Sequence, residues 1–336
     1  GSIVKPDVVF YGGNAGMNAG KLEKTGIKSF SIDGTPAYNV GTSFSTPWVS
    51  RMAAELTHLV KEEFDPLLIR ALLIHNAKYP ANNSMSMTDK VTQMGFGAPS
   101  SVQEMLYNSE DEITLILRDT LEKGSFIEMF DFPFPESLVD KDGNFIGQII
   151  VTLVTKSLLD DKQAGEYCQS NIDILFGTYE TETDRDTSKK GIKNPKGLEE
   201  PQNILLESLY SARVKGAHPF TGFERECTLV KYGKKFHPVK KYAIDLSEMT
   251  TSNRQRYLRG DRKWYLKIEG LYRDFIEQDA RARNYQLSQE YCLLLTIRDP
   301  NGKAPVYDEV AQQLDYKNFL HHNIQLRNVV TIDGTL

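Results

Sequence analysis

The sequence predicts two successive regions of different fold class: an α/β region over residues 1–110 and an all-β, sandwich-like domain over residues 111–336. The first expectation rests on apolar residues after residue 44 that recur at three- and four-residue steps, as on one face of a helix. The second rests on short runs of β-branched and aromatic residues after residue 110, separated by turn residues. At 336 residues, the chain is long enough for two domains that each bury a core.

The first region is predicted to contain one short strand, a glycine-rich connection and a long helix. The apolar run Val8–Phe10 predicts a buried strand, and the stretch from Gly12 to Gly20 predicts a loop. The helix begins near Phe44, and Pro47 fits only in its first turn, where a missing N–H breaks no helical hydrogen bond. Its expected apolar face comprises Val49, Met52, Ala53, Leu56, Leu59 and Val60.

Two more helices complete this region. Asp65-Pro66 predicts the N-cap and first position of a second helix that reaches His75. A turn is expected at Gly95-Phe96-Gly97-Ala98-Pro99, and Ser100 or Ser101 then begins a short helix through Leu106.

Nine β-rich runs follow in the second region. They are Ile113–Leu117, Phe126–Phe132, Ile146–Thr155, Ile172–Phe176, Thr228–Tyr232, Val239–Leu246, Lys263–Leu271, Tyr291–Ile297 and Ile324–Ile332. The charged, polar segment near residues 180–203 predicts a mobile insertion or a long hairpin loop, because it has almost no large apolar side chains.

Composition narrows the possible partners. A net charge of −5 with no basic stripe gives no reason to expect nucleic acid, and no apolar run approaches the ~20 residues that span a bilayer. Cys168, Cys227 and Cys292 have neither metal-ligand nor disulfide spacing, which mildly favours a reducing, cytoplasmic location. No metal or cofactor is predicted. Asp140-Lys141-Asp142-Gly143-Asn144 begins like a calcium loop but lacks the required glutamate, so we expect a hairpin turn.

The tripeptide Gly41-Thr42-Ser43, directly before the first predicted helix, suggests a catalytic serine. A nucleophilic serine needs exposure on a tight turn, a base within reach and donors for an oxyanion. The free N–H groups and positive end of a helix favour developing negative charge, and Ser43 is placed to use them. Taken alone, however, Thr42 or Ser43 could equally be a simple N-cap.

The longer string Gly41-Thr42-Ser43-Phe44-Ser45-Thr46-Pro47-Trp48-Val49-Ser50 closely resembles the serine signature of the subtilase family. Three further blocks, in family order, extend the resemblance over about the first 108 residues: Lys5-Pro6-Asp7-Val8-Val9, Asp65-Pro66 with Arg70-Ala71-Leu72-Leu73, and Gly95-Phe96-Gly97. The resemblance implies that Ser43 is the nucleophile of a serine endopeptidase acting on a peptide or protein. It also implies backbone oxyanion contacts at the Gly41-Thr42-Ser43 turn, Phe44 beside the leaving group, and the C-terminal portion of a doubly wound parallel sheet.

The family order places the catalytic Asp and His before the serine, yet no histidine precedes His58. His58 lies ~22 Å further along the same predicted helix, too far to act as the base. His75 is expected to be a packed or surface residue, and a base recruited from His218, His237, His321 or His322 would have no family precedent. Asn14 superficially resembles the family's side-chain oxyanion donor, but its position favours a loop role.

We therefore expect a fragment of a subtilase-type peptidase that lacks the Asp and His of the triad and is inactive alone. Two alternatives remain open. One is a pseudopeptidase that keeps the fold without catalysis, and the other is a protein-binding module that acts through its β-rich domain.

Overall fold

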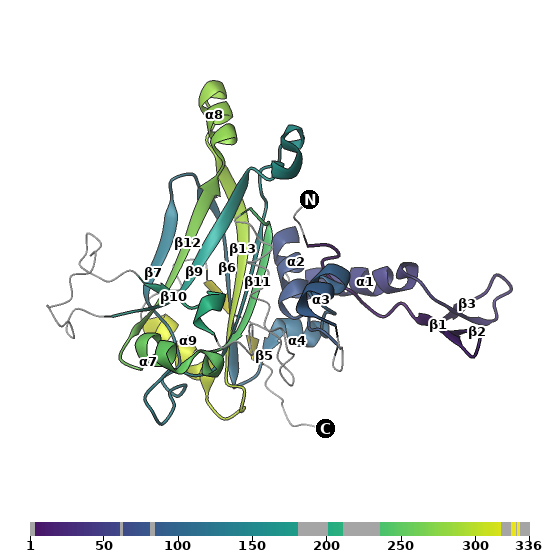
Figure 1. Cartoon of the computed structure of the whole chain (residues 1–336), viewed down its shortest axis with the longest axis horizontal. Coiled ribbons are helices and arrows are strands. Elements are labelled where there is room, and N and C mark those ends of the chain that lie inside the picture. Colours follow the sequence, from purple (N-terminus) through teal and green to yellow (C-terminus); the bar gives the residue numbers. More distant parts are fainter. Residues whose placement is uncertain are drawn as a thin grey trace. The chain divides into compact units, whose positions relative to one another are not determined.

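The computed structural model describes residues 4–60, 63–80, 85–180, 201–210, 236–316, 324–326 and 328–329. The chain divides into two compact units, an N-terminal unit of Val4–Leu106 and a β-rich unit from Tyr107 onward (Figure 1). The architecture is mixed α/β. None of the helices in the described ranges combines the length and the apolar character needed to cross a bilayer.

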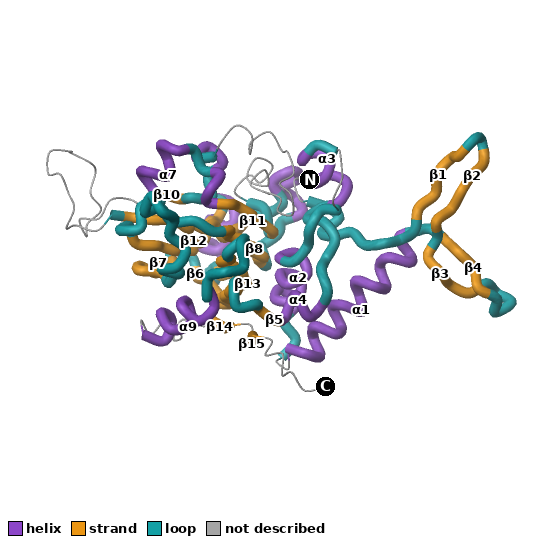
Figure 2. Tube along the Cα trace, turned by 90° about the horizontal axis from the view of Figure 1, so that it is seen from below, coloured by secondary structure: helices purple, strands orange, loops and turns teal. Residues whose placement is uncertain are grey.

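The N-terminal unit contains two hairpins followed by four helices among its described residues. The hairpins pair β1 (Asn14–Asn18) with β2 (Lys21–Thr25) and β3 (Ile27–Phe30) with β4 (Pro36–Asn39). Figure 2 shows them diverging beside the start of α1. The helices are α1 (Thr42–Val60), α2 (Pro66–His75), α3 (Met87–Met94) and α4 (Val102–Leu106).

The β1–β2 hairpin corrects the prediction of a loop from Gly12 to Gly20. Its two strands are joined by Ala19 and Gly20, with φ angles of 48° and 77°. Positive φ at both central residues is the requirement of a type I′ turn, whose twist matches that of paired strands. The turn geometry therefore sustains a hairpin whose first strand, Asn-Ala-Gly-Met-Asn, has little β propensity.

The described residues of the N-terminal unit show no portion of a doubly wound parallel sheet, and the prediction of a strand at Val8–Phe10 was wrong. Within these residues, the sheets of the unit are the two antiparallel hairpins. Around residues 8–10, Val9 N–H donates to Gly97 O at 3.0 Å, and Phe96 N–H donates to Asp7 O at 2.9 Å. The segment is thus held by the Gly95–Gly97 turn, and it has no neighbouring strand with which to build a ladder among the described residues.

The predicted cap of α2 is confirmed, but α1 begins at Thr42, before the predicted start near Phe44, so that Pro47 lies inside the helix and not in its first turn. Asp65 caps α2, because its Oδ1 accepts from Leu67 N at 2.8 Å and from Leu68 N at 3.2 Å. The helix α1 packs against α2 and α4, with Leu56 fully buried. Further buried apolar residues of this unit include Leu68, Ile69, Leu72, Ile74, Phe96, Val102 and Met105.

An ion pair joins the start of the unit to α2. The Arg70 guanidinium donates to Asp7 through Nε at 3.2 Å and Nη2 at 3.0 Å, and Lys5 Nζ contacts the same carboxylate at 3.0 Å. Burial alone raises the pKa of Asp7, but the hydrogen bonds and charges of Arg70 and Lys5 outweigh it, so the pKa lies below 3.8. Folding therefore favours the ionised carboxylate. The ionised Asp7 contributes to stability above its ordinary pKa, and this contribution is lost as pH falls through the lowered pKa of the folded chain.

We expect Asp7→Asn to lower the free energy of unfolding at neutral pH by about 1–3 kcal/mol, because the partly buried Arg70 loses its charged partner. The difference between variant and wild type should shrink as pH falls from 3.8 through the lowered pKa, below which Asp7 is protonated in both the folded and the unfolded chain. Urea unfolding across a pH series measures this. Lys5→Gln is the control and should cost less than ~0.5 kcal/mol, because the Lys5 side chain is exposed. Equal losses in both variants would contradict the role given to Arg70.

The β-rich unit is built on two antiparallel sheets, with strand orders β10-β9-β12-β7 and β11-β8-β13-β6-β14. The strands are β6 (Glu112–Glu122), β7 (Phe126–Phe132), β8 (Gln148–Thr155), β9 (Ser170–Tyr179), β10 (Gln202–Asn203), β11 (Val239–Asp245), β12 (Lys263–Tyr272), β13 (Ser288–Arg298) and β14 (Ile324–Leu326). These bounds confirm most of the predicted β-rich runs. Residues 228–232 and most of the segment near 180–203 lie outside the described residues.

Both sheets contribute to one hydrophobic cluster. Alternate residues of β6, β8 and β13 join alternate residues of β9 and β12 in it, together with Met129 and Phe132 of β7. Trp264 of β12 lies inside, with its ring stacked on Phe134 at a centroid distance of 4.1 Å and near Phe176 at 5.0 Å. These strands were predicted from short runs of β-branched and aromatic residues, and most of their residues are buried, those of β13 on both faces of the strand.

Several elements of this unit were not predicted. They are β5 (Tyr107–Asn108) in a parallel pair with β15 (Asn328–Val329), helices α7 (Thr251–Tyr257), α8 (Asp274–Arg283) and α9 (Val306–Tyr316), and short 3-10 helices at Asp161–Glu166, Glu207–Leu209 and Leu246–Glu248. The Gln313 side chain on α9 bonds both Phe134 N, at 3.2 Å, and Phe134 O, at 3.0 Å. Its amide completes the backbone hydrogen bonding of the residue that follows β7 by two positions. At residues 140–144 the expected hairpin turn is confirmed, with Asp140 Oδ1 accepting from Asp142 N and Asn144 N at 2.9 Å each.

Candidate active site

Ser43 lies at the second position of α1, directly after the turn at Gly41, and is exposed. The Gly41 carbonyl accepts from Phe44 N at 3.0 Å, which closes the first turn. Ser45 Oγ and Thr46 Oγ1 both donate to the Thr42 carbonyl, at 3.1 and 2.9 Å. These bonds fix the helix start around the serine.

The helix start has the electrostatic character expected of an anion site. The first N–H groups of a helix have no intrahelical acceptor, and the helix dipole adds partial positive charge there. Ser43 lies in this turn, and the first turn of α1 carries no acidic residue that would neutralise it. The arrangement can therefore stabilise negative charge that develops beside the Ser43 hydroxyl.

The glycine-rich segment packs closely against the serine turn. Gly41 N–H donates to Gly12 O at 2.8 Å, and a Cβ at Gly12 would lie 2.8 Å from Gly41 O. At Gly26, between β2 and β3, an added Cβ would lie 2.7 Å from Asn39 N. Only glycine permits both approaches. Sequence reasoning missed this contact, because Gly12 and Gly41 are far apart in the chain and no local pattern links them.

No catalytic base is in place beside Ser43 in the described part of the chain, where the serine side chain forms no hydrogen bond. His58 is exposed on α1 itself, His75 is buried at the end of α2, and His237 is buried in the β-rich unit. His218, His321 and His322 lie outside the described residues. Within the described ranges, no group of three or more His, Cys, Asp or Glu side chains is arranged to hold a metal ion.

Asn14 takes part in a local contact. It begins β1, and its Oδ1 accepts from Ala15 N at 2.9 Å. This Asx-type bond organises the start of the hairpin. The predicted loop role of Asn14 is therefore corrected, because the residue belongs to a strand and pairs with Thr25.

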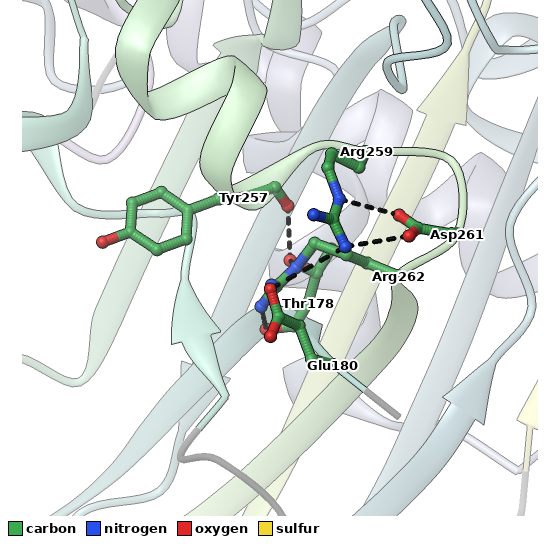
Figure 3. Close-up of polar contacts among 6 residues, drawn as sticks. All are labelled: Thr178, Glu180, Tyr257, Arg259, Asp261 and Arg262. Carbon is green, nitrogen blue, oxygen red and sulfur yellow. Dashed lines mark hydrogen bonds and ion pairs between the residues drawn. The ribbon is translucent and has the colours of Figure 1, made fainter. Parts of the chain in front are cut away.

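A second polar cluster lies in the β-rich unit, where β9 ends and β12 begins (Figure 3). The buried Arg262 guanidinium donates to Thr178 Oγ1 at 2.9 Å and to Glu180 Oε1 at 2.8 Å. Beside it, Arg259 bonds Asp261 at 3.0 and 2.8 Å. These contacts compensate the buried charge and tie β9 to β12, so we interpret the cluster as structural.

An exposed serine thus lies at a helix start, behind a glycine turn and close-packed glycines, and its hydroxyl is accessible from solvent. The comparison with known families is more specific: residues 1–99 match the model of the subtilase family, Peptidase S8. This part of the chain is therefore similar to subtilisin-like peptidases, as its sequence blocks indicated. No curated protein matches the chain.

Proposed function

We propose that this chain carries the nucleophile segment of a subtilase-type serine endopeptidase, with Ser43 as the nucleophile. The observation that carries the proposal is the exposed Ser43 in the first turn of α1, behind the Gly12–Gly41 contact, within a region that matches the subtilase family. In this proposal residues 1–110 are the C-terminal portion of the catalytic domain. Residues 111–336 form the sandwich-like domain, which the core shared by its two sheets supports.

In the proposed reaction, Ser43 Oγ attacks the carbonyl carbon of a peptide bond while a histidine accepts its proton. N–H groups of the helix start stabilise the oxyanion of the tetrahedral intermediate. The histidine then protonates the leaving amine, and water hydrolyses the Ser43 ester by the reverse sequence of proton transfers. The histidine and its orienting aspartate would come from a part of the protein outside the described residues. The 336-residue chain alone should accordingly be inactive.

The test compares peptide hydrolysis by the protein in which this chain follows an Asp-x-Gly and a His-Gly-Thr block with that of its Ser43→Ala variant. We expect a loss of about 10⁶-fold in kcat, because the nucleophile acts as a unit with its base. Ser50→Ala, which removes an exposed hydroxyl further along α1, is the control and should stay within about twofold.

Two results would overturn the proposal. One is hydrolysis by the purified 336-residue chain that survives Ser43→Ala. The other is an upstream sequence without the Asp and His blocks. The second result would favour a pseudopeptidase or a binding protein that acts through its β-rich unit.

A further inference from the structure

One side of the β3–β4 hairpin presents apolar and aromatic side chains to solvent. Lys28 pairs with Tyr38 and Phe30 pairs with Pro36 across the two strands. Opposite and alternate residues of a hairpin share a face, so these four side chains form one surface, which we call the aromatic face. All four are exposed, with Phe30 at 75% and Tyr38 at 61%. Large aromatic rings exposed together mark a surface that other molecules contact.

The aromatic face is tied to the nucleophile turn. Strand β4 ends at Asn39, and the chain then runs through Gly41 directly into α1. Tyr38 is five residues before Ser43, which limits their separation to ~18 Å. The glycine contacts with the Asn39 backbone hold the hairpin close to this connection: a Cβ at Gly13 would lie 3.1 Å from Asn39 O.

The hairpin is preformed. At its turn, Asp33 Oδ1 accepts from Thr35 N at 3.1 Å and from Thr35 Oγ1 at 2.7 Å, and it also accepts from Ser31 Oγ. The hydrogen bonds from Ser31 and Thr35 lower the pKa of Asp33 to about 2. The carboxylate is therefore ionised, and its Oδ1 is bonded within the turn. A preformed surface loses little conformational entropy on binding.

Lys28 gives the face its charge preference. In the described part of the chain its ammonium group has no carboxylate partner, whereas the carboxylate of Asp33 is bonded within the turn. Among the strands that the structure describes, β3 pairs with β4 alone, so its other edge has no neighbouring strand there. Such an edge pairs with an extended peptide, and adjacent side chains select its sequence. A second copy of the hairpin is a poorer occupant, because face-to-face contact would bring Lys28 near Lys28.

We propose that the aromatic face binds an extended segment of the peptide substrate, and that Lys28 selects an acidic residue beside an apolar one within that segment. The inference rests on the proposed function, since it takes Ser43 as the point of attack. It assigns a substrate class to the site: peptides with an apolar and an acidic side chain within about five residues of the cleaved bond, given ~3.4 Å per extended residue.

The test uses the full chain and two fluorescent peptides of about eight residues, which span ~27 Å. They share an apolar core and differ only in carrying Glu or Lys beside it. Fluorescence anisotropy should give a Kd below ~1 mM and a preference of about fivefold for the Glu peptide, the size expected of one exposed charge pair. The preference should fall in high salt.

Three variants test which side chains cause the preference. Lys28→Glu should reverse the preference, and Tyr38→Ser should weaken both peptides by about fivefold through loss of aromatic contact. Lys141→Glu changes the net charge equally at an exposed turn of the β-rich unit and should leave the preference unchanged. Absence of binding by the wild type, or an unchanged preference in Lys28→Glu, would overturn the inference. Either outcome leaves the hydrolysis test of Ser43 intact, and a failed hydrolysis test would in turn leave peptide docking intact.

Discussion

Replacing Trp264 by alanine is expected to lower the free energy of unfolding of the β-rich unit by about 3–5 kcal/mol. The indole is only 2% exposed and lies among the rings of Phe134, Phe145 and Phe176, with centroid distances of 4.1–5.4 Å. Alanine would remove the stacking contacts and leave a cavity between the two sheets. Urea unfolding followed by far-ultraviolet circular dichroism measures the loss.

Two companion variants separate packing from other effects. The Trp264 indole N–H is buried without a hydrogen-bond partner in the described part of the chain, so Trp264→Phe gives up volume but no bond. It should cost less than half as much as alanine, about 1–2 kcal/mol. Phe275→Ala on α8 removes a half-exposed ring and should cost under ~0.5 kcal/mol. A Trp264→Ala variant as stable as Phe275→Ala would contradict the assignment of Trp264 to the core.

Replacing Gly95 by alanine is expected to destabilise the N-terminal unit by ~3 kcal/mol. Gly95 has a φ of 59° and a ψ of −121°, a backbone conformation that side chains disfavour. An added Cβ would also lie 1.9 Å from Pro6 O and 2.7 Å from Asp7 O. Since both neighbours are backbone atoms, the segment of Pro6 and Asp7 would have to move away from the turn. Amide exchange at Val9, which donates to Gly97 O, should then accelerate.

Gly34→Ala is the matched control. Gly34 also has a positive φ, 79°, but an added Cβ there meets nothing within 4 Å. It should cost only ~1 kcal/mol, the strain of the backbone alone. Similar losses at the two glycines would mean that the close approach of Pro6 and Asp7 adds nothing to the effect of φ.

Local patterns predicted strands where β-branched and aromatic residues gather in short runs. The runs at Phe126–Phe132 and Val239–Leu246 became β7 and β11, although β11 is buried along nearly its whole length and shows no alternation of buried and exposed residues. The Asp65-Pro66 pair predicted the start of α2 because the cap is made by these residues themselves. In contrast, α8 buries only Ala280, so it has no apolar stripe by which it could be recognised.

The parallel sheet was expected from the family resemblance, whereas the helices were predicted from local sequence patterns. The sheet prediction could therefore fail although the helices are present. A strand needs a neighbour, and the run at Val8–Phe10 shows that apolar character alone does not supply one. A helix start near Ser43 was predictable from the glycine turn at Gly41, whereas the expected place of Pro47 in the first turn was wrong, because α1 begins at Thr42. The contact of Gly12 with Gly41 was not, because it depends on how a hairpin of weak β formers folds back on the turn.

The two tryptophans of the chain offer a way to observe the two units separately. Trp48 lies on α1 of the N-terminal unit and is 44% exposed, whereas Trp264 is enclosed in the β-rich unit. A water-exposed indole emits at longer wavelengths than an enclosed one, so intrinsic fluorescence resolves them without an added label. Trp264→Phe leaves Trp48 as the sole emitter, five residues from the serine. Binding of a ligand near Ser43 would then change the fluorescence of Trp48.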